Sequence, residues 1–175
     1  MMCLTIWQPW ADLICPPIEG IPGLVLPGRL RLPKDIENRS WFTDFRGDLL
    51  IHAGRTVDWA ARVRFGLRQN EFVSGAIIGK VLLTGCSRYS TSPWHQDGMF
   101  AWRLARPERL RNPVEWKGRR GLFEVPAAAI GATWGSVVAG PAWDANGKEG
   151  LDGSDFLTLA LANEWEKLEH TPDDV

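Results

Sequence analysis

The sequence predicts an α+β fold: a small mixed β-barrel with helices at its rim and an extra helix at the C-terminal end. Segments with strand character outnumber helical ones, and their separations are irregular rather than a regular helix–strand alternation. Neither glycine-rich nucleotide motif, G-x-G-x-x-G or G-x-x-x-x-G-K-[ST], is present. Both observations favour a barrel over a doubly wound βαβ array. With 175 residues, the chain can build one full hydrophobic core.

The N-terminal third begins with a strand over residues 3–7. Pro9 suits the first turn of a helix, where its missing N–H costs nothing, so a short helix is expected over residues 10–14. Residues 16–28 hold four prolines and three glycines, a composition typical of a long loop. A strand of apolar residues follows at 49–53.

The middle of the chain predicts an amphipathic helix over residues 56–69, with Thr56 or Asp58 near its cap. Three further strands are expected, at residues 75–83, 100–105 and 121–125. Residues 1–126 should form the barrel domain, and residues 127–175 a C-terminal extension. Within that extension an acidic helix over 154–169 should pack on the barrel, or alternatively bind a partner.

Charge is divided unevenly along the chain. Residues 1–140 carry 18 Lys and Arg against 12 Asp and Glu, a net charge of +6, whereas residues 141–175 carry 2 against 9, a net charge of −7. A basic body suggests an anionic partner, although a solvated surface would give the same count.

Several function classes are disfavoured. No run approaches the roughly 18 apolar residues of a membrane-spanning helix, and no signal peptide is evident, so we expect a cytoplasmic protein without a membrane partner. Cys3, Cys15 and Cys86 lack metal-ligand spacing. We therefore expect buried, reduced thiols, no metal and no cofactor.

The most unusual segment is KDIENRSW, residues 34–41, which places charged and amide side chains directly before a core strand. On an extended chain Glu37, Arg39 and Trp41 share one face. An indole beside opposite charges suits a nucleobase, which it can stack on while the charges bind base edges. The alternative is a half-buried Glu37–Arg39 ion pair that holds the segment to the fold.

Other side chains could complete a nucleoside site. Gln8 offers an amide to a base edge, Trp10 could stack or belong to the core, and Trp94 lies in a polar loop. Phosphate groups could be bound by four basic residues, or these could simply be solvated: Arg46, Lys117, Arg119 and Arg120. Trp7, Trp59, Trp102 and Trp165 fit core positions, and His52 reads as a hydrogen-bonded core residue.

The order LTIWQPWADLI, KDIENRSW, RGDLLIHAG, GAIIGKVLLTG, FAWRL and WKGRRGLFEVP resembles the ASCH domain family, which has a PUA-like barrel. The resemblance covers about residues 3–126. It implies five or six barrel strands and a cleft lined by the QPW and K-x-I-E-N-R-x-W segments. It also implies binding of RNA or a modified nucleoside there, by contacts that would include Asn38.

Some ASCH proteins look like hydrolases, so the resemblance implies a second function: an amidohydrolase acting on N-acylated cytidine, or a ribonuclease. The family's small amidohydrolases use a Lys, a Thr three residues later and a distant Glu. Lys34 matches that Lys, while Glu37 stands at the Thr position. If the chain is catalytic, Lys34 is the expected base or nucleophile, and Glu37 the group that moves the proton.

Overall fold

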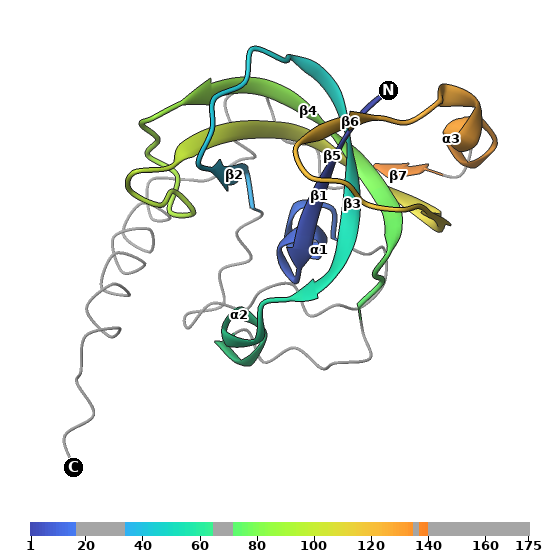
Figure 1. The fold of residues 1–175 in the computed structure, drawn as a ribbon, viewed down its shortest axis with the longest axis horizontal. Helices are drawn as coiled ribbons and strands as arrows, with labels where there is room; N and C mark the ends of the chain where they lie inside the picture. Colours follow the sequence, from blue (N-terminus) through green and yellow to red (C-terminus); the bar gives the residue numbers. More distant parts are fainter. Residues whose placement is uncertain (17–33, 65–71, 135–136, 140–175) are drawn as a thin grey trace.

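A computed structural model describes residues 1–16, 34–64, 72–134 and 137–139 of the chain. In these residues the fold is one mixed sheet with short helices (Figure 1), which confirms the α+β class. The strands are β1 (Met2–Gln8), β2 (Ile36–Arg39), β3 (Gly47–Val57), β4 (Ala76–Ser87), β5 (Phe100–Glu115), β6 (Leu122–Glu124) and β7 (Val137–Ala139). The helices are α1 (Trp10–Ile14), α2 (Trp59–Arg64) and α3 (Ala127–Trp134).

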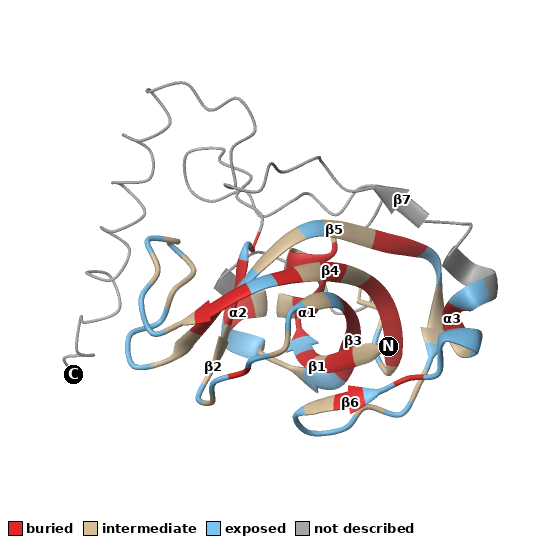
Figure 2. Cartoon of the chain, turned by 90° about the horizontal axis from the view of Figure 1, so that it is seen from above, coloured by how far each residue is buried: buried red, intermediate tan, exposed pale blue. Residues whose placement is uncertain are grey.

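Six strands follow the order β2-β5-β4-β3-β1-β6, and β7 pairs with β5. β1 and β3 run parallel, with Leu4 opposite Ile51, while the other strand pairs among the described residues are antiparallel. The sheet is strongly curved, and α1 lies within its curve (Figures 1 and 2). The closed, PUA-like barrel stays a prediction.

Side-chain alternation gives the sheet two buried faces. Leu4 and Ile6 of β1 join one apolar cluster with Trp102 and α1, while Cys3 joins a second cluster on the opposite face. Ile130 of α3 packs into this second cluster. Figure 2 shows the buried residues concentrated along the central strands. The described part of the predicted extension, α3 and β7, thus packs on or pairs with the sheet.

Several predicted elements differ in length from the observed ones, most clearly β5 and α2. β5 reaches Glu115 instead of ending near residue 105, because its pairing with β4 continues past register shifts at the bend where Arg106 has a φ of 50°. α2 begins at Trp59 because β3 continues to Val57. Asp58, one of the two predicted caps, accepts a hydrogen bond from the backbone N–H of Ala61 at 3.0 Å.

The predicted loop over residues 16–28 falls almost entirely outside the described residues, and the predicted helix over 154–169 does so completely. Among the described residues, no helix has the length and apolar character needed to cross a membrane. The three cysteines are free and buried, as expected.

Candidate functional site

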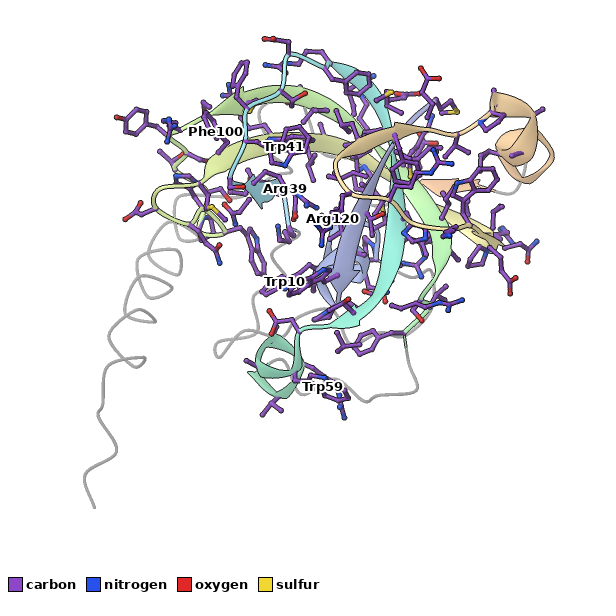
Figure 3. All side chains as sticks on the ribbon, in the orientation of Figure 1. Trp10, Arg39, Trp41, Trp59, Phe100 and Arg120 are labelled. Atoms are coloured by element: carbon purple, nitrogen blue, oxygen red, sulfur yellow. The ribbon has the colours of Figure 1, made fainter. Side chains whose placement is uncertain are left out.

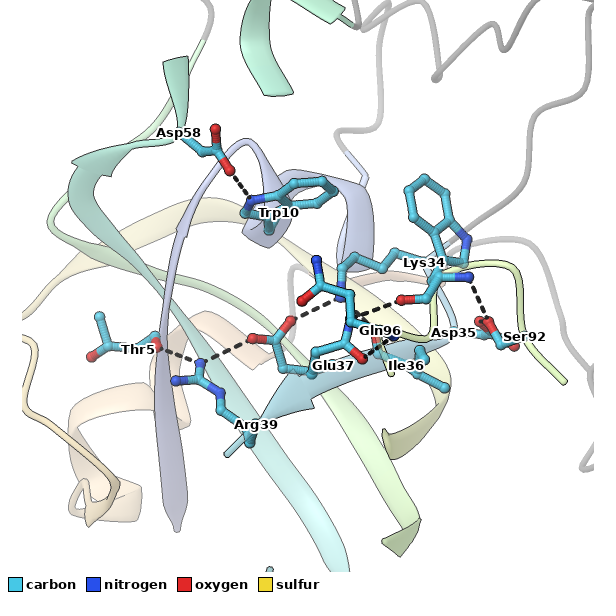
Figure 4. Close-up of polar contacts among 12 residues, drawn as sticks. Thr5, Trp10, Lys34, Asp35, Ile36, Glu37, Arg39, Asp58, Ser92 and Gln96 are labelled. Carbon is cyan, nitrogen blue, oxygen red and sulfur yellow. Dashed lines mark hydrogen bonds and ion pairs between the residues drawn. The ribbon is translucent and has the colours of Figure 1, made fainter. Parts of the chain in front are cut away.

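The charged side chains of the KDIENRSW segment form a chain of ion pairs (Figure 4). Lys34 Nζ lies 2.8 Å from Glu37 Oε2, and Glu37 Oε1 lies 3.1 Å from Arg39 Nη2. Arg39 Nη2 also donates to the Thr5 carbonyl at 2.9 Å. Lys34 and Glu37 are only 5% and 8% exposed. We call Lys34, Glu37 and Arg39 the ion-pair chain.

This arrangement follows from the local structure. Glu37 and Arg39 share a face of β2, as the alternation predicts, and Glu37 lies opposite Trp102 of β5. Lys34 precedes the strand, and its side chain extends along the first residues of β2, where it donates to the carbonyl of Ile36 and to Glu37. A buried ammonium requires such partners, because burying an unpaired charge is very costly. The hydrogen bond from Arg39 to the Thr5 carbonyl then joins the segment to β1.

Two tryptophans flank the ion-pair chain. The Trp10 ring lies 5.8 Å from Lys34 Nζ and packs edge-on against Trp94, with ring centroids 6.4 Å apart. Asn38 positions the loop that carries Trp94, because its Nδ2 donates to the Trp94 carbonyl at 2.7 Å and its Oδ1 accepts from the N–H of Gln96. The structure therefore brings four of the predicted site residues together: Trp10, Lys34, Asn38 and Trp94.

Trp41 and Gln8 are engaged inside the protein. Trp41 is half-buried and packs edge-on against Trp102, with ring centroids 4.6 Å apart. Gln8 is fully buried: its Nε2 donates to Asp12 and to the Val73 carbonyl, and its Oε1 accepts from the N–H of Asp12. Both side chains fasten elements of the fold to one another.

Asp12 extends this internal network. Its Oδ1 pairs with Arg109 of β5, and both side chains are almost fully buried. Desolvation raises the pKa of Asp12, although the Arg109 charge opposes that effect. The contacts of Gln8 therefore belong to a buried polar core between β1, α1 and β5.

A separate cleft of about 790 Å³ opens between β1, β3 and the turn that joins β5 to β6. Three of the four predicted phosphate-binding residues line it, Lys117, Arg119 and Arg120, together with Arg55. The fourth, Arg46, is not among the lining residues and donates to the carbonyls of its neighbours Thr43 and Phe45. Among the described residues, the lining has four basic side chains and one acidic side chain, Glu115, so this part of the cleft wall carries a net positive charge.

The residues of the ion-pair chain do not line this cleft, nor do Trp10, Asn38, Trp41 and Trp94. The two regions meet at Thr5, which lies in the cleft wall. Its carbonyl accepts from Arg39, and its Oγ1 accepts from the backbone N–H of Arg119 at 3.2 Å. Thr5 thus connects the ion-pair chain to the basic turn.

The floor of the cleft contains a neutral histidine. His52 is 2% exposed, and its Nε2 lies 2.9 Å from the Trp116 carbonyl. A carbonyl only accepts, so Nε2 carries the proton and Nδ1 is left as an acceptor, which has no hydrogen-bond partner among the described residues. Burial lowers the pKa of His52 below its ordinary value of 6.5. The prediction of a hydrogen-bonded core histidine is confirmed.

Gly118 allows the basic turn to lie against this floor. A Cβ atom at this position would lie 2.6 Å from His52 Cε1 and 2.9 Å from Thr5 Oγ1, closer than side chains tolerate. Glycine is therefore required for the close approach of the turn to β1 and β3.

The expectation that Trp7 and Trp59 belong to the core is wrong, while that for Trp102 is confirmed. Trp7 is 56% exposed and lines the cleft, and Trp59 is 52% exposed. Figure 3 shows Trp59 at α2, at the periphery of the molecule. The alternation along β1 indicates that Trp7 lies on the face opposite to Leu4 and Ile6, but not whether that face is covered at this position. Arg55 carried no comparable signal.

No protein-family model matches the chain, and no curated protein matches it. The resemblance to the ASCH family therefore stays a prediction from the motifs.

Proposed function

We propose that the protein binds RNA or a modified nucleotide in the basic cleft, as a member of the ASCH family with a PUA-like barrel. The observation that carries this proposal is the composition of the cleft wall: four basic side chains line it together with an exposed tryptophan. Its volume of about 790 Å³ is in the range of small-molecule sites, roughly 300–1,000 Å³.

Each group has a distinct role in this proposal. The exposed indole of Trp7 stacks on a base, and the cationic side chains of the basic turn contact phosphate. Thr5 provides a hydroxyl group for a base edge.

The residues of the KDIENRSW segment act indirectly here. Arg39 fixes the Thr5 carbonyl, and Asn38 fixes the Trp94 loop. The proposal includes a cytoplasmic location, to which free, buried cysteines are suited.

The test is the salt dependence of RNA binding. Replacing Lys117, Arg119 and Arg120 together with Gln should weaken binding of a fluorescein-labelled oligouridylate. It should also reduce the slope of log K against log salt by about 2, since each phosphate contact on a single strand contributes roughly 0.7. Arg46→Gln is the matched control, because this arginine lies outside the cleft lining. Equal losses in both variants, or none in either, would refute the proposal.

A hydrolase at the ion-pair chain is the second candidate. The observation that favours it is the 2.8 Å contact of Lys34 Nζ with Glu37 beside the Trp10 ring, since Lys34 occupies the position of the family's catalytic Lys. In this reaction Lys34 first passes its ammonium proton to Glu37. The neutral amine of Lys34 then takes a proton from water as the water attacks the acyl carbon, and Glu37 gives its proton to the leaving amine. Chromatography of N4-acetylcytidine and of RNA incubated with the protein tests it. Absence of product, or equal turnover by Glu37→Gln, excludes the reaction.

A further inference from the structure

We propose that the ligand is a single-stranded nucleic acid of several nucleotides, and that Trp59 on α2 stacks a base next to the one held at Trp7. This inference rests on the proposed function of the cleft. It adds a second binding position outside the cleft and specifies the ligand as a strand rather than a free nucleoside.

The backbone brings the end of β1, which carries Trp7, next to the start of α2, which carries Trp59. Gln8, which follows Trp7, is the parallel partner of Val57 at the end of β3. The N–H of Asp58, which precedes Trp59, donates to the Gln8 carbonyl at 2.7 Å. The end of β1 and the start of α2 are therefore fastened together, with one tryptophan on each side of the junction.

Both indoles are exposed to an extent that a core role does not explain. About half of each side chain is accessible, 56% for Trp7 and 52% for Trp59. Each is accompanied by an arginine: Arg62 lies over the Trp59 ring, 4.8 Å from its centroid, and Arg55 lines the cleft with Trp7. Exposed aromatics interleaved with cations are the pattern by which proteins bind single strands without reading their sequence.

The nature of the ligand follows from this geometry. Trp59 does not line the cleft, so a free nucleoside bound inside the cleft would leave it unused. In a duplex the bases are already stacked on one another and are not available to side chains. A single strand that leaves the cleft over the β1–α2 junction would use both indoles and both arginines.

Calorimetric titration with uridine 5′-monophosphate and with a tetrauridylate tests the inference. The tetramer should bind more tightly than the monophosphate. Trp59→Ala should weaken tetramer binding about 5- to 150-fold, which corresponds to roughly 1–3 kcal/mol per stacked base. It should leave the monophosphate affinity unchanged, whereas Trp7→Ala should weaken both. Trp59→Phe should retain most of the affinity, because a phenyl ring still stacks.

Tyr89→Ala is the control, since Tyr89 is 87% exposed but does not line the cleft. The inference fails, and the proposed function stands, if the tetramer binds no more tightly than the monophosphate. The same holds if Trp59→Ala leaves tetramer binding unchanged, or lowers it no more than Tyr89→Ala does. If the wild-type protein binds neither ligand, the proposed function and the inference fall together.

Discussion

Replacing Glu37 with Gln should destabilise the protein strongly, because it leaves the buried ammonium of Lys34 without a counterion. Lys34 Nζ lies 2.8 Å from Glu37, and at an effective dielectric constant of about 20 their attraction is roughly 6 kcal/mol. Part of this offsets the desolvation of both groups. Removing one partner of such a pair typically costs about 3–5 kcal/mol, the value we expect for Glu37→Gln.

A double-mutant cycle separates this contact from other effects of the substitutions. Lys34→Met should cost less than Glu37→Gln, since Glu37 keeps Arg39 as a partner at 3.1 Å. The double variant should cost at least about 1 kcal/mol less than the sum of the two, because the second change removes the charge that the first left unpaired. Urea unfolding followed by tryptophan fluorescence measures each free energy. Additivity within about 0.5 kcal/mol would refute the reasoning.

Three further predictions concern the cleft and its surroundings. Because burial lowers the pKa of His52, this residue stabilises the folded state fully above pH 6.5 and progressively less below it. The free energy of unfolding should therefore fall more between pH 7 and pH 5 for the wild type than for His52→Gln. Parallel curves of unfolding free energy against pH would contradict this. Gly118→Ala should lower the free energy of unfolding by about 1–3 kcal/mol, because the added Cβ would overlap His52. Gly131→Ala is the control and should not lower it, because the Cβ added there meets nothing within 4 Å. Equal effects of the two substitutions would count against the close approach of the turn to His52. Asn38→Ala should speed amide hydrogen exchange in residues 88–99, because it removes the hydrogen bond to the Trp94 carbonyl. Residues 49–53 serve as the reference whose exchange should not change. Unaltered exchange in residues 88–99 would show that Asn38 does not hold this loop in place.

The central strands could be predicted because their apolar runs are local. Leu49, Leu50 and Ile51 are all fully buried, and the sequence alone indicates this. The C-terminal half of β5 could not be predicted, since Pro107 and Pro113 read as breaks. Its continuation depends on the register shifts along β4, which are a tertiary property.

The candidate site was predictable in part. The charged character of the KDIENRSW segment indicated a Glu37–Arg39 ion pair as the alternative to a base-binding site. This ion pair is present in the structure. The basic turn of residues 117–120 was visible in the sequence, but the cleft itself was not, because its wall is assembled from β1, β3 and the turn after β5. Which tryptophan faces outward depends on which face of a curved sheet is covered, and composition does not contain that information.

The Arg39–Thr5 hydrogen bond has a mechanical consequence. β2 and β1 are separated by three strands in the sheet order, yet this side-chain contact joins them across the curve. Paired neighbouring strands separate only when their whole row of backbone hydrogen bonds breaks. The contact between β2 and β1, in contrast, is lost when the single Arg39–Thr5 hydrogen bond breaks. We therefore expect the distance between Thr5 and β2 to vary in solution, while the backbone hydrogen bonds between neighbouring strands of the sheet are kept.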